Sequence, residues 1–162
     1  MSKTIMLAVD IAHGEAGKHV AAAVDLIKEL AEPDDKVIVL HVHEFAASKF
    51  GRTQVDCLDQ QGEQLVSGIV ADLGRSGISA SGKITEAELS YVARTILAKA
   101  TQEGATMLVL GSSTRTDLPW APFGSVSSRL LHISPLPVLI VPMRPGNAGE
   151  RAEVTEVIGG VT

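Results

Sequence analysis

A group of glycine and serine residues in the second half of the sequence is the strongest candidate for a binding site. The pattern is Gly111-Ser112-Ser113-Thr114, then nine residues, then Gly124-Ser125-Val126-Ser127. The apolar run before it is typical of a buried strand, and the residues after it have helical spacing. Glycine lets a backbone approach a ligand closely, and the first amides of a helix are unpaired and favour negative charge. The pattern therefore predicts an anion site, in which the hydroxyls of Ser125 and Ser127 bind phosphate oxygens.

The same residues also fit a purely structural role. Gly124 would then only permit a tight turn, and Ser125 would only cap the following helix. The residue types alone leave both interpretations open.

Three other phosphate or nucleophile motifs fail on inspection. A Walker A loop would need a glycine at Ala12 and a hydroxyl at His19, beside Gly17-Lys18. No Gly-x-Gly-x-x-Gly follows the first apolar run, which argues against a standard dinucleotide fold. A nucleophile elbow would need a glycine at Arg115, where the tight turn does not easily accept a long side chain.

Metal and redox chemistry find little support. His41 and His43 stand two residues apart on an expected strand, so they point to one face, and with His13 nearby they could hold a metal. They also fit a polar strand end. No carboxylate or cysteine accompanies them at ligand spacing, and we predict no metal site. Cys57 is the single cysteine, which excludes an internal disulfide and fits a reducing compartment.

The apolar runs and helical stripes alternate along the chain. Expected strands cover residues 4–9, 37–42, 78–84, 107–110 and 138–141, and expected helices cover residues 15–31, 55–74, 89–100 and 125–134. This alternation predicts right-handed crossovers and a Rossmann-like α/β/α sandwich, an open five-stranded parallel sheet that is doubly wound. Because ligands of such folds bind at the carboxyl ends of the strands, we expect Asp10, Val42 and Gly111 to lie close together.

Several local details are also predicted. Residues 45–53 are expected to form a loop. Gly74 is expected to close the second helix, and Gly104 the third. The third helix is expected to begin at one of two caps, Ser90 or Thr85.

Length and composition narrow the class of protein. The chain has 162 residues, enough for one domain, with 45% hydrophobic but only 3% aromatic residues. We expect an aliphatic core in a domain spanning residues 1–142, and a flexible tail at 143–162. A formal charge of −5 offers no basic footprint for nucleic acid or an anionic membrane. No apolar run reaches the length of a membrane span, and Asp10 interrupts the first run, so we predict a cytoplasmic protein without a signal peptide.

The sequence resembles the universal stress protein family over about residues 3–142. The resemblance rests on a first strand that ends in Asp10 and on four motifs. These are Val-Ile-Val-Leu-His-Val (37–42), Gly-Ala-Thr-Met-Leu-Val-Leu-Gly-Ser (104–112), Phe-Gly-Ser-Val-Ser (123–127) and Pro-Leu-Pro-Val-Leu-Ile-Val-Pro (135–142).

The resemblance implies a cytoplasmic homodimer, often paired through the last strand, with a role in stress response. Members of the family that bind ATP, with Mg²⁺, carry Gly-x2-Gly-x9-Gly-Ser/Thr. Carried over, Asp10 would lie by the adenosine, the Val42 backbone would meet the adenine edge and Gly111 would approach the ribose and phosphates. The phosphate chain would be held by Gly124, Ser125 and Ser127, with Val126 in the same turn.

One departure from that pattern bears on function. Thr114 stands where the family has its second glycine, and a β-branched side chain disfavours positive φ and crowds the phosphates. Its hydroxyl could instead bond a phosphate. The loop that follows also carries Trp120 between Pro119 and Pro122, so it could cover a nucleotide or fill its place.

Three functions remain open. The first is a regulatory domain that binds ATP or another adenine nucleotide, with at most slow hydrolysis because no catalytic couple stands near the loop. The second is a member that binds no nucleotide and acts as a dimeric protein-interaction module. The third is an enzyme of the wider fold, against which stands the absence of Ser-Gly-Gly-x-Asp-Ser and His-x-Gly-His loops.

Overall fold

The computed structural model describes residues 1–10, 16–48, 51–52, 56–112 and 124–142. The side chains of residues 16–19, 47–48, 51–52 and 56–59 lie outside this description. The expected tail at 143–162, together with Thr114 and Trp120, also lies outside the described residues.

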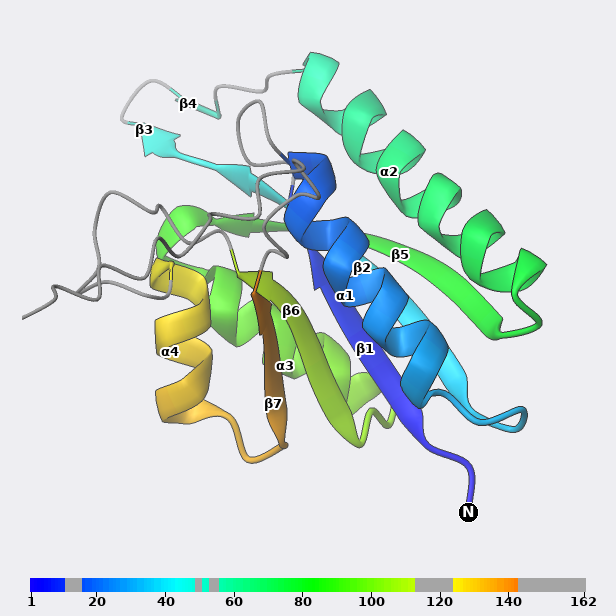
Figure 1. The fold of residues 1–162 in the computed structure, drawn as a ribbon. Coiled ribbons are helices and arrows are strands. Elements are labelled where there is room, and N and C mark those ends of the chain that lie inside the picture. Colours follow the sequence, from blue (N-terminus) through cyan, green and yellow to red (C-terminus); the bar gives the residue numbers. More distant parts are fainter. Residues whose placement is uncertain (11–15, 49–50, 53–55, 113–123, 143–162) are drawn as a thin grey trace, which may run out of the picture.

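Helices and strands alternate along the described chain (Figure 1). The strands are β1 (Thr4–Val9), β2 (Lys36–Phe45), β3 (Ala47–Ser48), β4 (Gly51–Arg52), β5 (Ser79–Glu88), β6 (Met107–Ser112) and β7 (Val138–Pro142). The helices are α1 (Ala16–Leu30), α2 (Asp56–Arg75), the short 3₁₀ helix η1 (Leu89–Tyr91), α3 (Val92–Gln102) and α4 (Ser125–Ile133).

Five strands form one parallel sheet in the order β5-β2-β1-β6-β7. From β1 the chain moves outward to β2 and β5, then returns to the other side of β1 for β6 and β7. The direction of winding therefore reverses between β1 and β6. The predicted open, doubly wound, five-stranded parallel sheet is confirmed.

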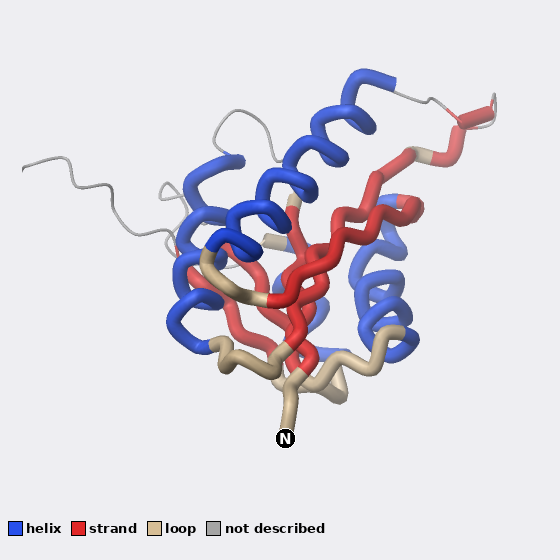
Figure 2. Tube along the Cα trace, turned by 90° about the vertical axis from the view of Figure 1, so that its right-hand side faces the viewer, coloured by secondary structure: helices blue, strands red, loops and turns tan. Residues whose placement is uncertain are grey.

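Helices cover both faces of this sheet, as Figure 1 and Figure 2 show. Alternate residues of β1 belong to two different apolar clusters, because successive side chains of a strand point to opposite faces. Leu7 packs with residues of α1 and α2, such as Ile27 and Leu73. Met6 packs with residues of α3 and α4, such as Ile96 and Leu130. The central strand is thus buried on both sides by aliphatic residues, as its continuous apolar run predicts.

Two strand predictions are corrected. The third long strand covers Ser79–Glu88 rather than 78–84, and all of it pairs with β2. Its side chains are mostly exposed, so the hydrophobic period that predicts strand length is weak there. The segment expected to be a loop from Phe45 contains the end of β2 and the small antiparallel pair of β3 and β4. Strands of two residues are too short for any periodicity to reveal.

Two further predictions, both about helix ends, are corrected. Gly74 lies inside α2, and the left-handed turn falls at Gly77, which has φ +79°. Gly104, with φ +67°, does end α3 as predicted. Neither Thr85 nor Ser90 caps α3: Thr85 lies in β5 and Ser90 in η1. The residue at the start of α3 is Tyr91, which makes no side-chain cap hydrogen bond.

Within the described residues, no helix combines the length and apolar character needed to cross a membrane.

Candidate functional site

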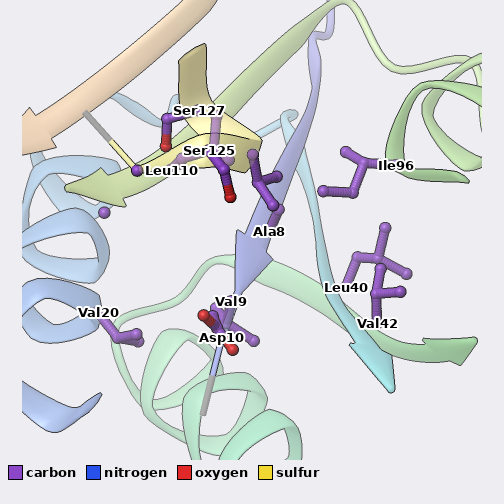
Figure 3. A pocket seen from close by; sticks show the side chains of 13 residues that line it. Ala8, Val9, Asp10, Val20, Leu40, Val42, Ile96, Leu110, Ser125 and Ser127 are labelled. Atoms are coloured by element: carbon purple, nitrogen blue, oxygen red, sulfur yellow. The ribbon is translucent and has the colours of Figure 1, made fainter. Parts of the chain in front are cut away.

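A cleft opens at the carboxyl ends of the strands, at the point where the winding reverses (Figure 3). Its volume is about 140 Å³. Seven of the eight predicted site residues line it: Asp10, Val42, Gly111, Gly124, Ser125, Val126 and Ser127. The eighth, Thr114, lies outside the described residues.

The cleft also contains residues that sequence reasoning missed. All six are apolar: Ala8, Val9, Val20, Leu40, Ile96 and Leu110. The signal for Leu40 was available, because it lies two residues before Val42 on the same face of β2. No comparable signal exists for Val20 and Ile96, which reach the cleft from α1 and α3 only through the packing of those helices.

The two sides of the cleft differ in character (Figure 3). Leu40, Val42 and Ile96 lie together on one side and form an apolar wall. Ser125 and Ser127 lie on the other, in the first turn of α4. An apolar wall suits a flat ring, and hydroxyls beside a helix N-terminus suit an anion.

The start of α4 has features that suit an anion. The N-cap residue is Gly124, which has no side chain to occupy the first-turn amides and makes no side-chain cap hydrogen bond. Ser125 is the first helical residue, so the interpretation of it as the cap is wrong. Gly124 has φ −65°, which any residue can adopt, so its backbone conformation does not require glycine. Fully buried Leu130 anchors the same helix in the core.

Negative charge gathers at the opposite, β1 and β2 side of the cleft. Asp10 follows β1 and is exposed, and Glu44 lies near the end of β2. Partial burial raises the pKa of Glu44 above its ordinary value, and the charge of Asp10 raises it further, while His43 acts in the opposite direction. An anionic group is therefore better accommodated beside α4 than beside these carboxylates.

The two strand histidines lie on the other face of the sheet. His41 and His43 are both buried, and His41 contacts α2 at Gly62, so the prediction that they share one face agrees with the alternation of β2. The Nδ1–H of His41 donates to the Val9 carbonyl at 3.2 Å. Among the described residues, no three histidine, cysteine, aspartate or glutamate side chains group closely enough to hold a metal ion. His13 lies outside those residues.

Comparison with protein families identifies this architecture. The family model described as the universal stress protein family matches residues 1–142. The chain belongs to the universal stress protein family. Curated proteins include no match to its sequence.

Solved structures of family members share the fold of this universal stress protein at low sequence identity. One from Burkholderia pseudomallei has 22% identity and a TM-score of 0.65, over 86% of this chain and 96% of that one. One from Arabidopsis thaliana, described with AMP bound, has 15% identity and a TM-score of 0.63, over 90% and 94%. One from Archaeoglobus fulgidus, described in complex with dAMP, has 18% identity and a TM-score of 0.62, over 86% and 97%.

Proposed function

We propose that this universal stress protein binds an adenine nucleotide in the cleft beside α4 and acts as a regulatory domain in stress response. One observation carries the proposal: Asp10, Val42, Gly111 and the first turn of α4 line a single cleft at the reversal of the sheet. The descriptions of two structural relatives, with AMP and with dAMP, support the same class of ligand.

Each part of the ligand has a matching part of the cleft. The adenine ring would lie against Leu40, Val42 and Ile96, where apolar surface is removed from water. The phosphates would meet the first amides of α4 and the hydroxyls of Ser125 and Ser127. ATP with Mg²⁺ is the form we propose, and the metal would reach the site with the phosphates.

A regulatory role fits better than rapid catalysis. Within the described part of the chain, the lining residues include one carboxylate, Asp10, and two serines, but no histidine, lysine or arginine. Phosphoryl transfer depends on charged groups placed around the transferred phosphate. Any hydrolysis by these residues would therefore be slow.

The test is to denature the purified protein, analyse the released small molecules, and titrate refolded protein with ATP and with AMP by calorimetry. We expect co-purified adenine nucleotide, or binding in the micromolar range that Gly124→Val abolishes because a side chain then enters the phosphate site. Gly68→Ala, a glycine of α2 with open space around it, is the matched control and should leave affinity unchanged. Absence of bound nucleotide together with no saturation at millimolar ATP would reject the proposal.

A second candidate function is supported by the size of the cleft. Its volume of about 140 Å³ lies below the roughly 300–1,000 Å³ typical of small-molecule sites. A member that binds no nucleotide would act instead as a protein-interaction module. Thr114→Gly separates the two candidates: a rise in ATP affinity supports a nucleotide site crowded by the threonine, and an unchanged affinity argues against that explanation.

We further propose that the protein is a cytoplasmic homodimer paired through β7. This strand lies at the edge of the sheet, and Leu139 and Ile140 are only partly buried. Exposed apolar edges tend to be paired or covered. Sedimentation velocity tests the pairing: Ile140→Lys should convert a dimer to a monomer, and an unchanged mass would contradict it.

A further inference from the structure

The outer edge of β5 is a long, open strand edge. β5 runs from Ser79 to Glu88 and pairs along its whole length with β2. No described strand pairs with its other side, and in Figure 2 the strand that follows α2 lies in front of the rest of the sheet. A strand edge without a neighbouring strand offers N–H and C=O groups to an added strand. The opposite edge, β7, is half as long and ends in Pro142.

Two of the usual protections of an edge strand, a proline and a bulge, are absent from β5. Edge strands are commonly shielded by proline, by a bulge or by a lysine that stands over the edge. β5 contains no proline, and its register with β2 is continuous. Its one lysine, Lys83, forms an ion pair with Glu103 at the end of α3, with 3.2 Å between Nζ and Oε1. The lysine is thus drawn to the α3 face and away from the α2 face.

An apolar groove accompanies the edge on its α2 face. It has a volume of about 500 Å³ and is lined by Glu63, Val66, Ser67, Val70, Ala71, Gly82 and Ile84. Gly82 permits its shape, because a Cβ there would lie 2.5 Å from Cγ1 of Val66. Ile84 is 46% exposed although it is a large apolar residue. A branched apolar side chain on an added strand would enter this groove and contact Ile84.

The charges around the groove are acidic. Glu63 lines it directly, and Glu86 follows Ile84 by two residues and so shares its face of β5. The described residues that line the groove include no lysine or arginine. A second copy of this chain would bring the same glutamates to that face, whereas its Lys83 pairs with Glu103 on the α3 side of β5. Charge complementarity therefore favours a basic partner over self-pairing.

We propose that the β5 edge is a docking site for an extended basic segment of a partner protein, in which apolar and basic residues alternate. The segment adds to the sheet as a sixth strand through main-chain hydrogen bonds. One of its apolar side chains enters the groove beside Ile84, and a basic side chain approaches Glu63. This is strand addition, in which the backbone supplies affinity and the pockets supply specificity.

The test uses a fluorescent peptide of alternating lysine and valine, and a second peptide with glutamate in place of lysine. Fluorescence anisotropy should give saturable binding of the basic peptide only. Ile84→Asp and Glu63→Lys should each weaken that binding by about tenfold or more, because each removes a central contact. Two controls match them: Ile133→Asp, at a residue of α4 that is 41% exposed, and Glu32→Lys, at an exposed residue beyond α1, should change affinity less than about twofold.

Amide hydrogen exchange gives an independent result on the location. Binding of the basic peptide should slow exchange within Ser79–Glu88 and leave β7 unchanged. Equal binding of the two peptides, or protection confined to other elements, would overturn the proposal. So would a dimer that Ile84→Asp converts to monomer, because the occupant would then be a second copy. A gain in peptide affinity on removal of residues 143–162 would assign the edge to this chain's own C-terminal segment instead.

Discussion

Polar groups have different surroundings at the amino and at the carboxyl ends of the parallel strands. At the amino ends, Asp35 is buried and accepts hydrogen bonds from the backbone N–H of Lys3 at 2.6 Å and of Glu32 at 2.9 Å. The Lys3 ammonium lies 3.4 Å from the same carboxylate. Backbone hydrogen bonds from Lys36 to Lys3 and from Thr106 to Thr4 tie the turns before β2 and β6 to the start of β1.

At the carboxyl ends, the polar groups face a cleft. Asp10 is exposed, Ser125 and Ser127 line the opening, and the pKa of Glu44 is raised by burial and by Asp10. One end of the sheet therefore satisfies its polar groups internally and contributes stability. The other end leaves polar groups facing the cleft, which is where ligands of parallel α/β folds generally bind.

The strongest test of this contrast is Asp35→Ala. We expect the largest loss of stability among these variants, because two backbone N–H groups lose a buried, charged acceptor. Urea denaturation should show a clear fall in the unfolding midpoint with little change in slope. Asp34→Ala, at the exposed neighbouring residue, is the control. A midpoint for Asp35→Ala no lower than that of the control would mean that the amino end does not hold the fold as described.

The pH dependence of stability sharpens the same point. The hydrogen bonds from Glu32 and Lys3 lower the pKa of Asp35 in the folded protein. Its stabilising contribution is therefore complete above the unfolded pKa of about 3.9 and is lost as the pH falls toward the lower folded value. Asp35→Asn should flatten the fall in stability below about pH 4. If the stability of Asp35→Asn falls below pH 4 as steeply as that of the original protein, Asp35 is not the group responsible.

Gly62→Ala tests how the carboxyl end is supported. A Cβ at Gly62 would lie 2.4 Å from Cδ2 and 2.7 Å from Nε2 of His41, so the ring must move. We expect a loss of about 1–3 kcal/mol in the free energy of unfolding, as for other overpacked cores. The same ring donates a hydrogen bond to the carbonyl of Val9, the residue before Asp10. Because a shift of the ring would disturb this part of the cleft, nucleotide affinity should also fall. Stability and affinity both unchanged would show that His41 can be displaced without consequence.

Gly68→Ala is the matched change in the same helix and should act in the opposite direction. Nothing lies within 4 Å of a Cβ at Gly68. Alanine is a better helix former than glycine, so we expect a gain of roughly 0.5–1 kcal/mol in the free energy of unfolding. A measured loss in the free energy of unfolding would contradict the open space around this position.

The smallest expected effect belongs to Glu44→Gln. Because the folded pKa of Glu44 is raised, the folded state binds more protons than the unfolded state in that range, and stability falls as the pH rises through it. Glutamine removes this penalty, which solvent screening limits to about 0.5 kcal/mol at neutral pH. Nucleotide affinity should rise slightly, since one carboxylate no longer repels the phosphates. Thermal unfolding at pH 3 and pH 7 checks the sign: the gain should appear only at pH 7.

The sequence predicted the central strands well and the edge of the sheet poorly. β1 and β6 are buried, and their apolar runs mark them clearly. β5 has one neighbouring strand and is mostly exposed. Its polar residues therefore give no clear hydrophobic period from which its length could be predicted. The end of α2 was also ambiguous in the sequence, because Gly74 and Gly77 both stand near the turn. Of these two, only Gly77 adopts positive φ. Local patterns do not decide which of two nearby glycines takes the left-handed conformation.

The amino-acid sequence by itself determined the alternation of strands and helices, and with it the meeting of Asp10, Val42 and Gly111 at one end of the sheet. The reason is that hydrophobic periodicity is local, and parallel strands joined by crossovers end on the same side. Only the tertiary structure decided that Val20 and Ile96 complete the cleft, that Gly62 admits the His41 ring and that a groove runs beside β5. These features depend on how helices distant in sequence pack against the sheet, which no local pattern records.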